Sequence, residues 1–202
     1  MNQQASTKAI ELQQLGDEVR NLEASPLFAY RTEHNYSAVI GDGNVDAQIM
    51  FIGEAPGEQE AKRGLPFVGA SGRFLDELLK SINLQRADVY ITNVVKDRPP
   101  ENRDPTSAEI QLYTPFLVRQ LTIIQPKVVV TLGRFAMDFV LALFQMAERG
   151  QKISVLHGKL LQASATYGTI AVLPLFHPAV ALYANERKQT LIDDFQALKE
   201  FV

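Results

Sequence analysis

The feature that most constrains the fold is a repeated alternation of short apolar segments with longer segments of helical spacing. Strands bury runs of about four to eight apolar residues, whereas an amphipathic helix repeats its apolar positions every three or four residues. The expected strands are 48–52, 89–95, 127–132 and 169–175. The expected helices are 8–23, 71–82, 106–124, 134–147 and 187–202.

This alternation predicts an α/β protein, namely a three-layer α/β/α sandwich with a central, mainly parallel sheet. The chain has 202 residues, which is enough for one sizeable core. We therefore predict a single domain over 1–202, with an N-terminal helix at 1–24 packed on it.

Two local patterns predict where elements begin and turn. Thr106 and Glu109 have the spacing of a capping box, so they are expected at the start of the longest helix. Segment 153–163 is expected to form a hairpin that turns at His157 and Gly158.

The composition excludes several classes of function. The chain has no cysteine, which rules out disulfides, cysteine-ligated zinc, cysteine-held iron–sulfur clusters and a cysteine nucleophile. No apolar run approaches the length of a membrane span, and no apolar segment follows a basic start at the N-terminus. We therefore expect a cytoplasmic protein. The net charge of −3 argues against strong non-specific binding to DNA, although basic residues gather in the expected loops.

Chemically rich segments follow three of the expected strands. The first strand runs into Gly-Glu-Ala-Pro-Gly at 53–57, the second reaches Asn93, and the last ends just before His177. The carboxyl ends of parallel strands meet at one edge of a sheet. We therefore expect these segments to form one site.

The residue types at this edge suit recognition of a planar polar ligand. Glycines let the backbone approach a ligand, and Glu54 adds a carboxylate among them. Phe67 offers a stacking face, Asn93 offers a donor and an acceptor, and His177 follows an apolar strand. Each residue alone also has an ordinary structural role, as a turn former or a core ring, so the argument rests on their joint placement.

Two other interpretations of the glycine-rich segment are weaker. It has neither the Gly-Lys-Ser/Thr ending of a phosphate-binding loop nor the Gly-x-Gly-x-x-Gly of a dinucleotide site. Glu54, Glu58 and Glu60 suggest a metal site, but no second group of ligands stands at a telling spacing.

Five motifs in a fixed order carry a family resemblance. They are Gly-Glu-Ala-Pro-Gly-x-x-Glu at 53–60, Gly-x-Pro-Phe-Val-Gly-x-x-Gly at 64–72, Thr-Asn-Val-Val-Lys-x-Arg-Pro-Pro-x-Asn-Arg-x-Pro at 92–105, Pro-Lys-Val-Val-Val-Thr-Leu-Gly at 126–133 and His-Pro-Ala at 177–179. Each motif alone is weak, but the series is highly specific. From about residue 41 to residue 202, the chain resembles the family 4 uracil-DNA glycosylases.

The resemblance implies a role for each matching residue. Phe67 would stack on an extruded uracil, Asn93 would hydrogen-bond its polar edge, and His177 would donate to its O2 atom. Glu54 would position the attacking water or stabilise the cationic sugar, and Glu60 would lie near C5, where it crowds out the methyl group of thymine. Further contacts with uracil are expected from Gly53, Ala55, Pro56 and Gly57.

The resemblance also implies a surface for DNA. The loop after His177 would enter the minor groove and fill the hole left by the flipped nucleotide. The residues expected to touch DNA are Lys96, Arg98, Arg103, Pro178, Ala179, Leu182 and Tyr183.

The chain departs from the family at one point. Family 4 enzymes typically hold a [4Fe–4S] cluster with four cysteines, and Leu22, Ser25, Asp97 and Tyr113 stand at those positions. These four residues are not a plausible replacement set of ligands. We expect packing and hydrogen bonds to fill the space, with Tyr113 occupying much of it.

The expected activity is that of a monofunctional uracil-DNA glycosylase. It would flip uracil out of single- or double-stranded DNA, hydrolyse the N-glycosidic bond and leave an abasic site for base-excision repair. It would need no cofactor and would act as a monomer. Two alternatives stay open, namely a non-catalytic module that recognises uracil or single-stranded DNA, and a glycosylase for another deaminated base.

Overall fold

A single six-stranded sheet forms the centre of the computed structural model, which describes residues 3–202. Residues 1–2 of the predicted N-terminal helix lie outside the described residues. The strand order is β1-β3-β2-β4-β6-β5, with β3, β2, β4 and β6 mutually parallel and an antiparallel strand at each edge. The strands are β1 Asp42–Gly43, β2 Ile49–Gly53, β3 Tyr90–Asn93, β4 Val128–Leu132, β5 Leu161–Ala165 and β6 Gly168–Leu175.

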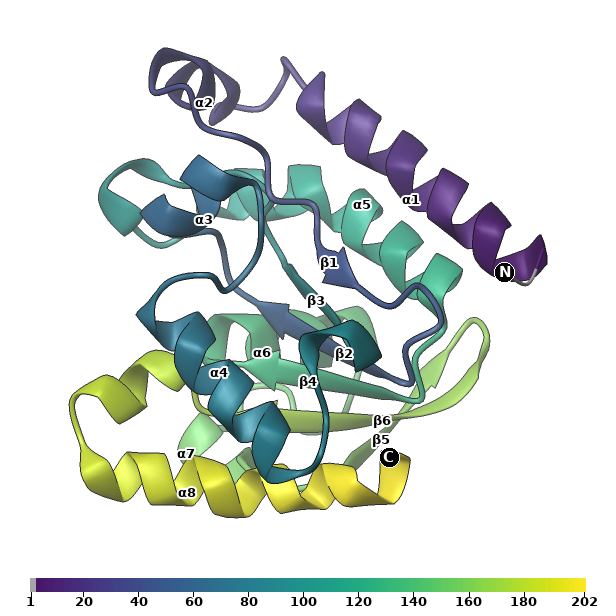
Figure 1. Ribbon diagram of the computed structural model, residues 1–202, viewed down its shortest axis with the longest axis vertical. Helices are drawn as coiled ribbons and strands as arrows, with labels where there is room; N and C mark the ends of the chain where they lie inside the picture. Colours follow the sequence, from purple (N-terminus) through teal and green to yellow (C-terminus); the bar gives the residue numbers. More distant parts are fainter. Residues whose placement is uncertain (1–2) are drawn as a thin grey trace.

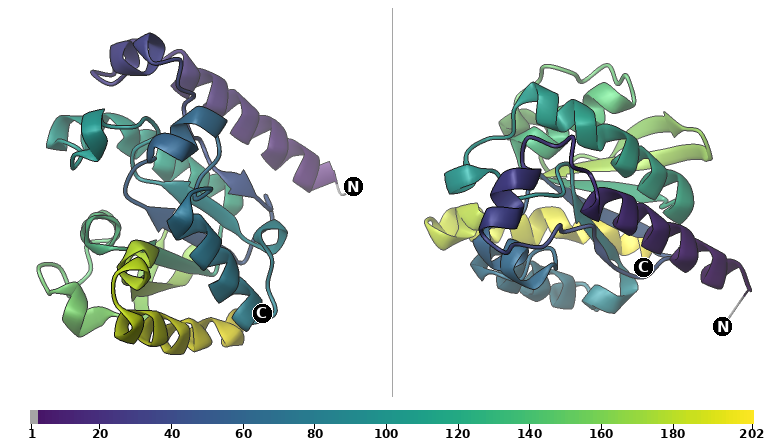
Figure 2. Two further views of the ribbon diagram at one scale, coloured as in Figure 1. Left: turned by 60° about the vertical axis from the view of Figure 1, so that its left-hand side comes forward. Right: turned by 90° about the horizontal axis from the view of Figure 1, so that it is seen from above.

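Helices cover both faces of the sheet, so the predicted three-layer α/β/α sandwich is confirmed (Figures 1 and 2). Helices α1, α5 and α6 lie on one face, and α4 and α8 lie on the other. The α-helices are α1 Gln3–Arg20, α2 Phe28–Glu33, α3 Glu58–Arg63, α4 Ala70–Ser81, α5 Ser107–Ile124, α6 Arg134–Leu143, α7 Ile153–Leu156 and α8 Asn185–Phe195. Short 3-10 helices are η1 Arg86–Asp88, η2 Pro100–Asn102, η3 Pro178–Leu182 and η4 Gln196–Phe201.

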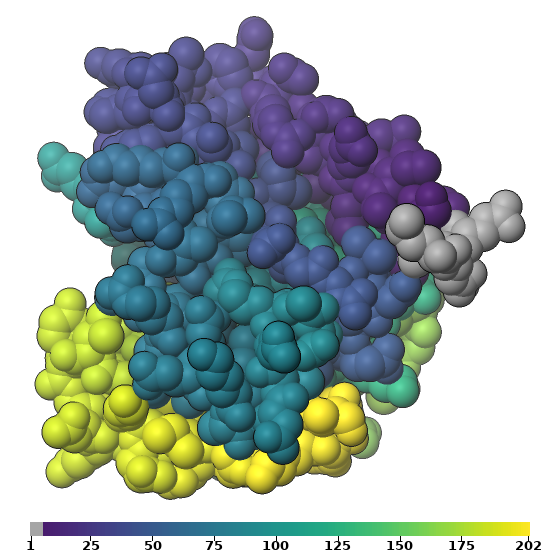
Figure 3. Space-filling model, viewed as in Figure 1, coloured from purple at the N-terminus to yellow at the C-terminus, as the bar shows by residue number. Residues whose placement is uncertain are grey.

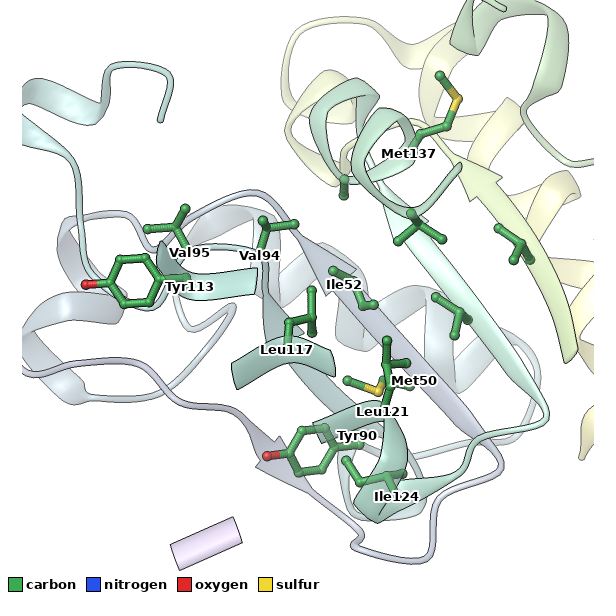
Figure 4. Packing of buried hydrophobic residues seen from close by; sticks show 14 of the residues in the cluster. Met50, Ile52, Tyr90, Val94, Val95, Tyr113, Leu117, Leu121, Ile124 and Met137 are labelled. Atoms are coloured by element: carbon green, nitrogen blue, oxygen red, sulfur yellow. The ribbon is translucent and has the colours of Figure 1, made fainter. Parts of the chain in front are cut away.

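The alternating faces of the strands explain the two apolar layers. Met50 and Ile52 of β2 pack into the cluster formed with α1, α5 and α6, whereas Ile49 and Phe51 pack into the cluster formed with α4 and α8. Figure 4 shows part of the first cluster, in which side chains of α5 lie over β2. Because both faces are covered, the central strands are apolar throughout, as the sequence predicted.

The capping box is confirmed, but the hairpin prediction for 153–163 is wrong. Residues 153–156 form helix α7, and the observed hairpin joins β5 to β6 through a two-residue turn at 166–167. Gly158 adopts a φ of 73° and its N–H donates to the carbonyl of Pro174, so it leads the chain from α7 toward the sheet. The sequence of α7 is mostly apolar and partly β-branched, and such a sequence is equally compatible with a strand. At the N-cap of α5, Thr106 and Glu109 exchange both hydrogen bonds.

None of the helices among residues 3–202 is long and apolar enough to cross a membrane.

Candidate functional site

A pocket of about 240 Å³ opens at the carboxyl ends of the parallel strands. This volume lies below the roughly 300–1,000 Å³ of sites for drug-sized ligands, so it suits a single small ring. Its lining brings together residues from β3, from the segment after β6, and from both sides of α3: Ala55, Gly57, Glu60, Phe67, Gly69, Ala70, Ser71, Asn93 and His177. The sequence predicted that the strand ends converge, and most of the residues predicted to contact uracil line this one pocket. Gly53 and Pro56 are not among the lining residues.

Asn93 presents an unused hydrogen-bonding group to this pocket. It is the last residue of β3, its exposed fraction is 1%, and its Oδ1 atom has no hydrogen-bond partner among the described residues. A buried amide oxygen without a partner is costly, and native proteins rarely leave one unless a ligand or water uses it. The Oδ1 atom of Asn93 is therefore able to accept a hydrogen bond from a donor in the pocket.

Phe67 stands beside Asn93 in a strained backbone conformation. Its φ is 51°, which is unusual for a bulky residue and fixes the direction of the ring. The guanidinium of Arg86 donates to the carbonyl oxygens of Pro66 and Phe67, at 2.5 and 3.0 Å, and also pairs with Asp76. These bonds hold the turn in a conformation that it would otherwise leave.

Glu60 secures the next turn from inside the pocket. Its Oε1 atom accepts hydrogen bonds from the backbone N–H groups of Val68 and Gly69, at 2.9 and 2.8 Å. Gly69 is the N-cap of α4, so the carboxylate also faces the positive end of that helix. Glu60 thus lines the pocket as predicted, and in addition it ties α3 to the start of α4.

His177 is held as a neutral imidazole. The backbone N–H of Ala179 donates to its Nδ1 atom at 3.1 Å, so Nδ1 carries no proton and Nε2 carries one. Burial lowers the pKa of His177 to about 4, although the nearby charge of Glu60 acts in the opposite direction. Its ring lies 5.7 Å from the ring of Phe67, centroid to centroid. A neutral donor and a stacking ring therefore border the same space.

Glu54 lies next to this pocket and is not part of its lining. It borders a small adjoining cavity with Val94, Pro105 and residues of α5 and α6. Burial and, to a smaller extent, the charge of Asp104 raise the pKa of Glu54, the charge of Arg134 lowers it, and the net value is about 7. Such a carboxylate changes its charge near neutral pH, which suits a group that acts on a proton or a cation.

One predicted DNA contact is wrong. Lys96 is completely buried, and its ammonium group donates to Thr92, Gln120 and the carbonyl oxygen of Asn93, at 2.8, 2.5 and 2.7 Å. A side chain that is enclosed in this way cannot reach a phosphate. Burial also lowers the pKa of Lys96 well below its usual range.

The other predicted basic contacts are partly engaged within the protein. Both terminal nitrogens of Arg103 bind the carboxylate of Glu109, at 2.6 and 2.9 Å, so this charge is largely neutralised. Arg98 is more available, since its hydrogen bonds within the described part of the chain go to neutral oxygens, on Tyr36 and Asn102. Of these two, Arg98 is the better candidate for a phosphate.

The segment after His177 presents exposed apolar side chains at the edge of the molecule. Leu182 and Tyr183 are 48% and 88% exposed, whereas Pro178 is buried and Ala179 is partly buried. This segment, which contains η3, lies beside α4 at the left-hand edge of Figures 1 and 3. Leu182 and Tyr183, which were predicted to contact DNA, are therefore accessible, whereas the buried side chain of Pro178 is not.

Several residues of the site were not predicted from the sequence. Gly69, Ala70 and Ser71 line the pocket at the start of α4, and Arg86 supports Phe67 from a different segment. The motif Gly-x-x-Gly at 69–72 was the available signal for the first three. No local pattern connects Arg86 with Phe67.

The four residues at the positions of the family's cluster ligands include three that touch one another. Ser25 Oγ lies 2.8 Å from the hydroxyl of Tyr113, which donates to Asp97 Oδ2 at 2.5 Å. Leu22 is partly buried and packs against the core. The set contains no thiolate, its only carboxylate is already paired, and no metal-binding group of residues is found in the described chain. These residues do not fit an iron–sulfur cluster, and hydrogen bonds and packing fill the region as predicted.

Comparison with known proteins agrees with the geometry. Residues 40–199 match the uracil DNA glycosylase superfamily. A type-4 uracil-DNA glycosylase of Sulfurisphaera tokodaii is 43% identical over 190 residues, which are 94% of this chain and 84% of the relative. The type-4 enzyme of Archaeoglobus fulgidus is 45% identical over 171 residues, 85% of this chain and 84% of the relative. The type-4 enzyme of Thermotoga maritima is 39% identical over 193 residues, 93% of each chain. The chain therefore belongs to the uracil DNA glycosylase superfamily and, within it, to the type-4 uracil-DNA glycosylases.

Proposed function

We propose that this protein flips uracil out of DNA and hydrolyses the bond between the base and the deoxyribose. The observation that carries the proposal is the small pocket in which an unpartnered amide oxygen, an aromatic ring and a neutral imidazole face one another. A base within a duplex cannot enter such a pocket, so the nucleotide must leave the stack first, at a cost of roughly a few kcal/mol.

The flipped base is held by two residues. The ring of Phe67 stacks on the face of uracil, and Oδ1 of Asn93 accepts the N3–H of uracil while its amide group donates to O4. Cytosine carries an amino group at C4 and no hydrogen at N3, so it presents the opposite pattern. The same amide thus selects uracil over the ordinary base from which it arises.

His177 and Glu54 act on the charges that develop during the reaction. As the N1–C1′ bond breaks, its electron pair moves onto the uracil ring, and the Nε2–H of His177 donates to O2, where negative charge gathers. The sugar becomes cationic, and the Glu54 carboxylate stabilises it and orients the water that adds to C1′. The backbone of 53–57 lines this side, and Glu60 crowds the methyl group of thymine.

The products are free uracil and an abasic site. The chain's own residues suffice for this hydrolysis, so no cofactor is required. Lyase chemistry would need a lysine that forms a Schiff base in the pocket; Lys96, close in sequence, is bonded to three oxygens and is not among the lining residues. The enzyme is therefore monofunctional.

Contact with DNA comes from two sides of the pocket. Leu182 and Tyr183 enter the minor groove and fill the gap left by the flipped nucleotide, and Arg98 contacts a phosphate. The substrate is uracil-containing DNA, single- or double-stranded. The chain forms one domain over 1–202, since both apolar layers share one sheet. In this proposal, the protein works as a monomer in the cytoplasm.

The test uses oligonucleotides that carry one uracil, either single-stranded or paired with guanine or adenine. After incubation with the protein, alkali cleaves any abasic sites, and the expected result is strand scission at the uracil. The variants Asn93→Ala and His177→Ala should lose most of this activity, and Tyr167→Phe, away from the pocket, should keep it. Binding of uracil-DNA without scission would replace the enzyme with a recognition module, and scission only at another deaminated base would change the substrate.

A further inference from the structure

Four buried side chains, here called the polar clamp, connect separate parts of the chain. They are Ser25, Arg31, Asp97 and Tyr113, and each is at most 7% exposed. Ser25 and Arg31 belong to the N-terminal segment, Asp97 follows β3, and Tyr113 belongs to α5. The clamp therefore joins three parts of the molecule that are distant in sequence.

The direction of every hydrogen bond in the clamp follows from counting protons. Tyr113 has one hydroxyl proton, and it donates this proton to Asp97 at 2.5 Å. Ser25 must then donate to the oxygen of Tyr113, at 2.8 Å, and its own oxygen accepts from the backbone N–H of Leu27. Burial, together with the charge of Asp97, raises the pKa of Tyr113 far above its usual range, so the donor stays protonated. The chain of donors ends on one carboxylate.

Arg31 compensates the buried charge of Asp97 and ties it to α1. Its Nη1 atom donates to both carboxylate oxygens of Asp97, at 2.9 and 3.1 Å. The same guanidinium donates to the carbonyl oxygens of Val19 and Arg20 at the C-terminal end of α1. Carbonyls at the C-terminal end of a helix carry partial negative charge, and the carbonyl of Val19 also accepts from the backbone N–H of Leu22. One cation therefore fixes both the end of α1 and the start of the 97–105 loop.

Apolar packing surrounds the polar groups. The ring of Tyr113 lies beside Val95 in Figure 4, with its hydroxyl directed away from the apolar cluster. A buried ion pair costs several kcal/mol of desolvation for each ion, and removing only one partner leaves an uncompensated charge. The members of the clamp therefore depend on one another.

We propose that the polar clamp replaces, without metal, the cluster that joins the N-terminal segment to the 97–105 loop in cysteine-bearing type-4 enzymes. Three of its members stand at the former ligand positions, and Arg31 supplies the positive charge. Because Asp97 precedes Arg98, the clamp also holds the backbone from which the Arg98 side chain reaches Tyr36 and Asn102, and it thereby positions Arg98 for a phosphate of DNA. This last role rests on the proposed function, whereas the joining role does not.

The first experiment is a double-mutant cycle on the hydroxyl of Tyr113 and the carboxylate of Asp97. Tyr113→Phe removes a bond to a charged acceptor, so the unfolding equilibrium constant should rise about tenfold to a hundredfold in denaturant titrations. The double variant Tyr113→Phe/Asp97→Asn should be less destabilised than the sum of the two single changes, because the two groups contact each other. Tyr167→Phe is the matched control, since its buried hydroxyl has no hydrogen-bond partner among the described residues.

Protease digestion and DNA titration separate the two roles. Tyr113→Phe should speed cleavage within 22–31 in limited proteolysis, and it should raise the KM for uracil-DNA severalfold with little change in kcat, because Arg98 loses its support. The joining role would be overturned if Tyr113→Phe lost no more free energy of unfolding than Tyr167→Phe. Strict additivity of the two changes in the double-mutant cycle would also overturn it. An unchanged KM and salt dependence in a destabilised variant would overturn the positioning role. If no variant and no wild-type protein cleaves uracil-DNA, the stability data still decide the first point.

Iron analysis tests the replacement of the cluster. The wild-type protein is incubated anaerobically with ferrous iron and sulfide, passed through a sizing column and assayed for iron and for visible absorbance. The bound iron and the visible absorbance should both stay at the level of a lysozyme control that is treated in the same way. Retention of iron in stoichiometric amounts would show that these residues hold a metal after all and would overturn the proposal.

Discussion

The Oδ1 atom of Asn93 lies 2.3 Å from the point at which a Cβ atom on Gly53 would stand. The tip of the Phe67 ring, at Cζ, lies 2.7 Å from the same point. Real Cβ atoms do not make contacts this short, so any side chain at residue 53 would displace both groups. Residue 53 must therefore be glycine, because it leaves room for Asn93 and Phe67, which line the pocket.

The first prediction concerns that space. Gly53→Ala should lower kcat/KM on uracil-DNA by about a hundredfold or more, because a displacement of about 1 Å in a binding group can have an effect of this size. Steady-state cleavage assays measure it. Gly16→Ala is the control: its added Cβ would meet mainly the flexible end of Arg20, and activity should be unchanged. Equal activity in both variants would show that Asn93 and Phe67 do not need their present positions.

The second prediction concerns pH and Glu54. The pKa of Glu54 is raised to about 7, and the proposed role requires the ionised form, so kcat/KM should increase with pH through a midpoint near 7 and level off above it. Asp104→Asn removes a negative charge and should lower the midpoint, whereas Arg134→Gln removes a positive charge and should raise it. Glu54→Gln should abolish this limb of the pH–rate profile. A limb that persists in Glu54→Gln would assign the titration to another group.

The third prediction concerns stability and His177. Its pKa is about 4 in the folded protein and about 6.5 in an unfolded chain, so the unfolded state binds more protons between these values. This contribution is present above pH 6.5 and is lost as the pH falls through 4, by about 1–3 kcal/mol in the free energy of unfolding. His177→Gln has no such titration, so denaturant unfolding at several pH values should give it a smaller loss over this window. Parallel stability curves for the two proteins would refute the depressed pKa.

The fourth prediction concerns Arg86, which supports Phe67 from behind. Arg86→Met removes two hydrogen bonds to the carbonyls of Pro66 and Phe67, and it should raise KM for uracil-DNA by about tenfold or more. Arg119→Met breaks a surface pair with Glu18 and serves as the control. If both variants bind and cleave uracil-DNA like the wild type, the hydrogen bonds from Arg86 are not needed to position Phe67.

The sequence predicted the convergence of Asn93 and His177 because that convergence follows from topology, whereas Phe67 reaches the same pocket from the turn between α3 and α4. Once the strands are parallel, their carboxyl ends share one edge, and residues at those ends are neighbours whatever separates them in the chain. The strands themselves were readable because a strand covered on both faces is apolar throughout.

Lys96 shows where the same reasoning failed. A lysine in a loop motif suggested contact with phosphate, but its ammonium group lies inside the protein with three oxygen acceptors. One of them belongs to Gln120, which stands 24 residues later on α5. A local pattern cannot reveal a compensating partner on another element, so the side chain was assigned to the surface.

Other misses have the same origin. The carboxylate of Glu60 binds backbone groups eight and nine residues away, and Arg31 meets Asp97 across 66 residues. The sequence showed the loss of the cluster ligands directly, because the residue types differ. It did not show that Arg31 compensates the buried charge of Asp97. Hydrogen bonds between distant segments depend on the finished packing.

Residues 93–97 form a short segment that connects the pocket with the polar clamp. Asn93 lines the pocket, and Asp97 belongs to the polar clamp. Between them, the buried Lys96 donates a hydrogen bond to the carbonyl of Asn93. A redesign of the clamp, for example for stability at higher temperature, would therefore act on backbone that reaches the pocket within five residues, and its effect on base selection should be measured alongside. Directed evolution of stability or of base selection should therefore vary these five positions together, along with their contacts on α5, and not one residue at a time.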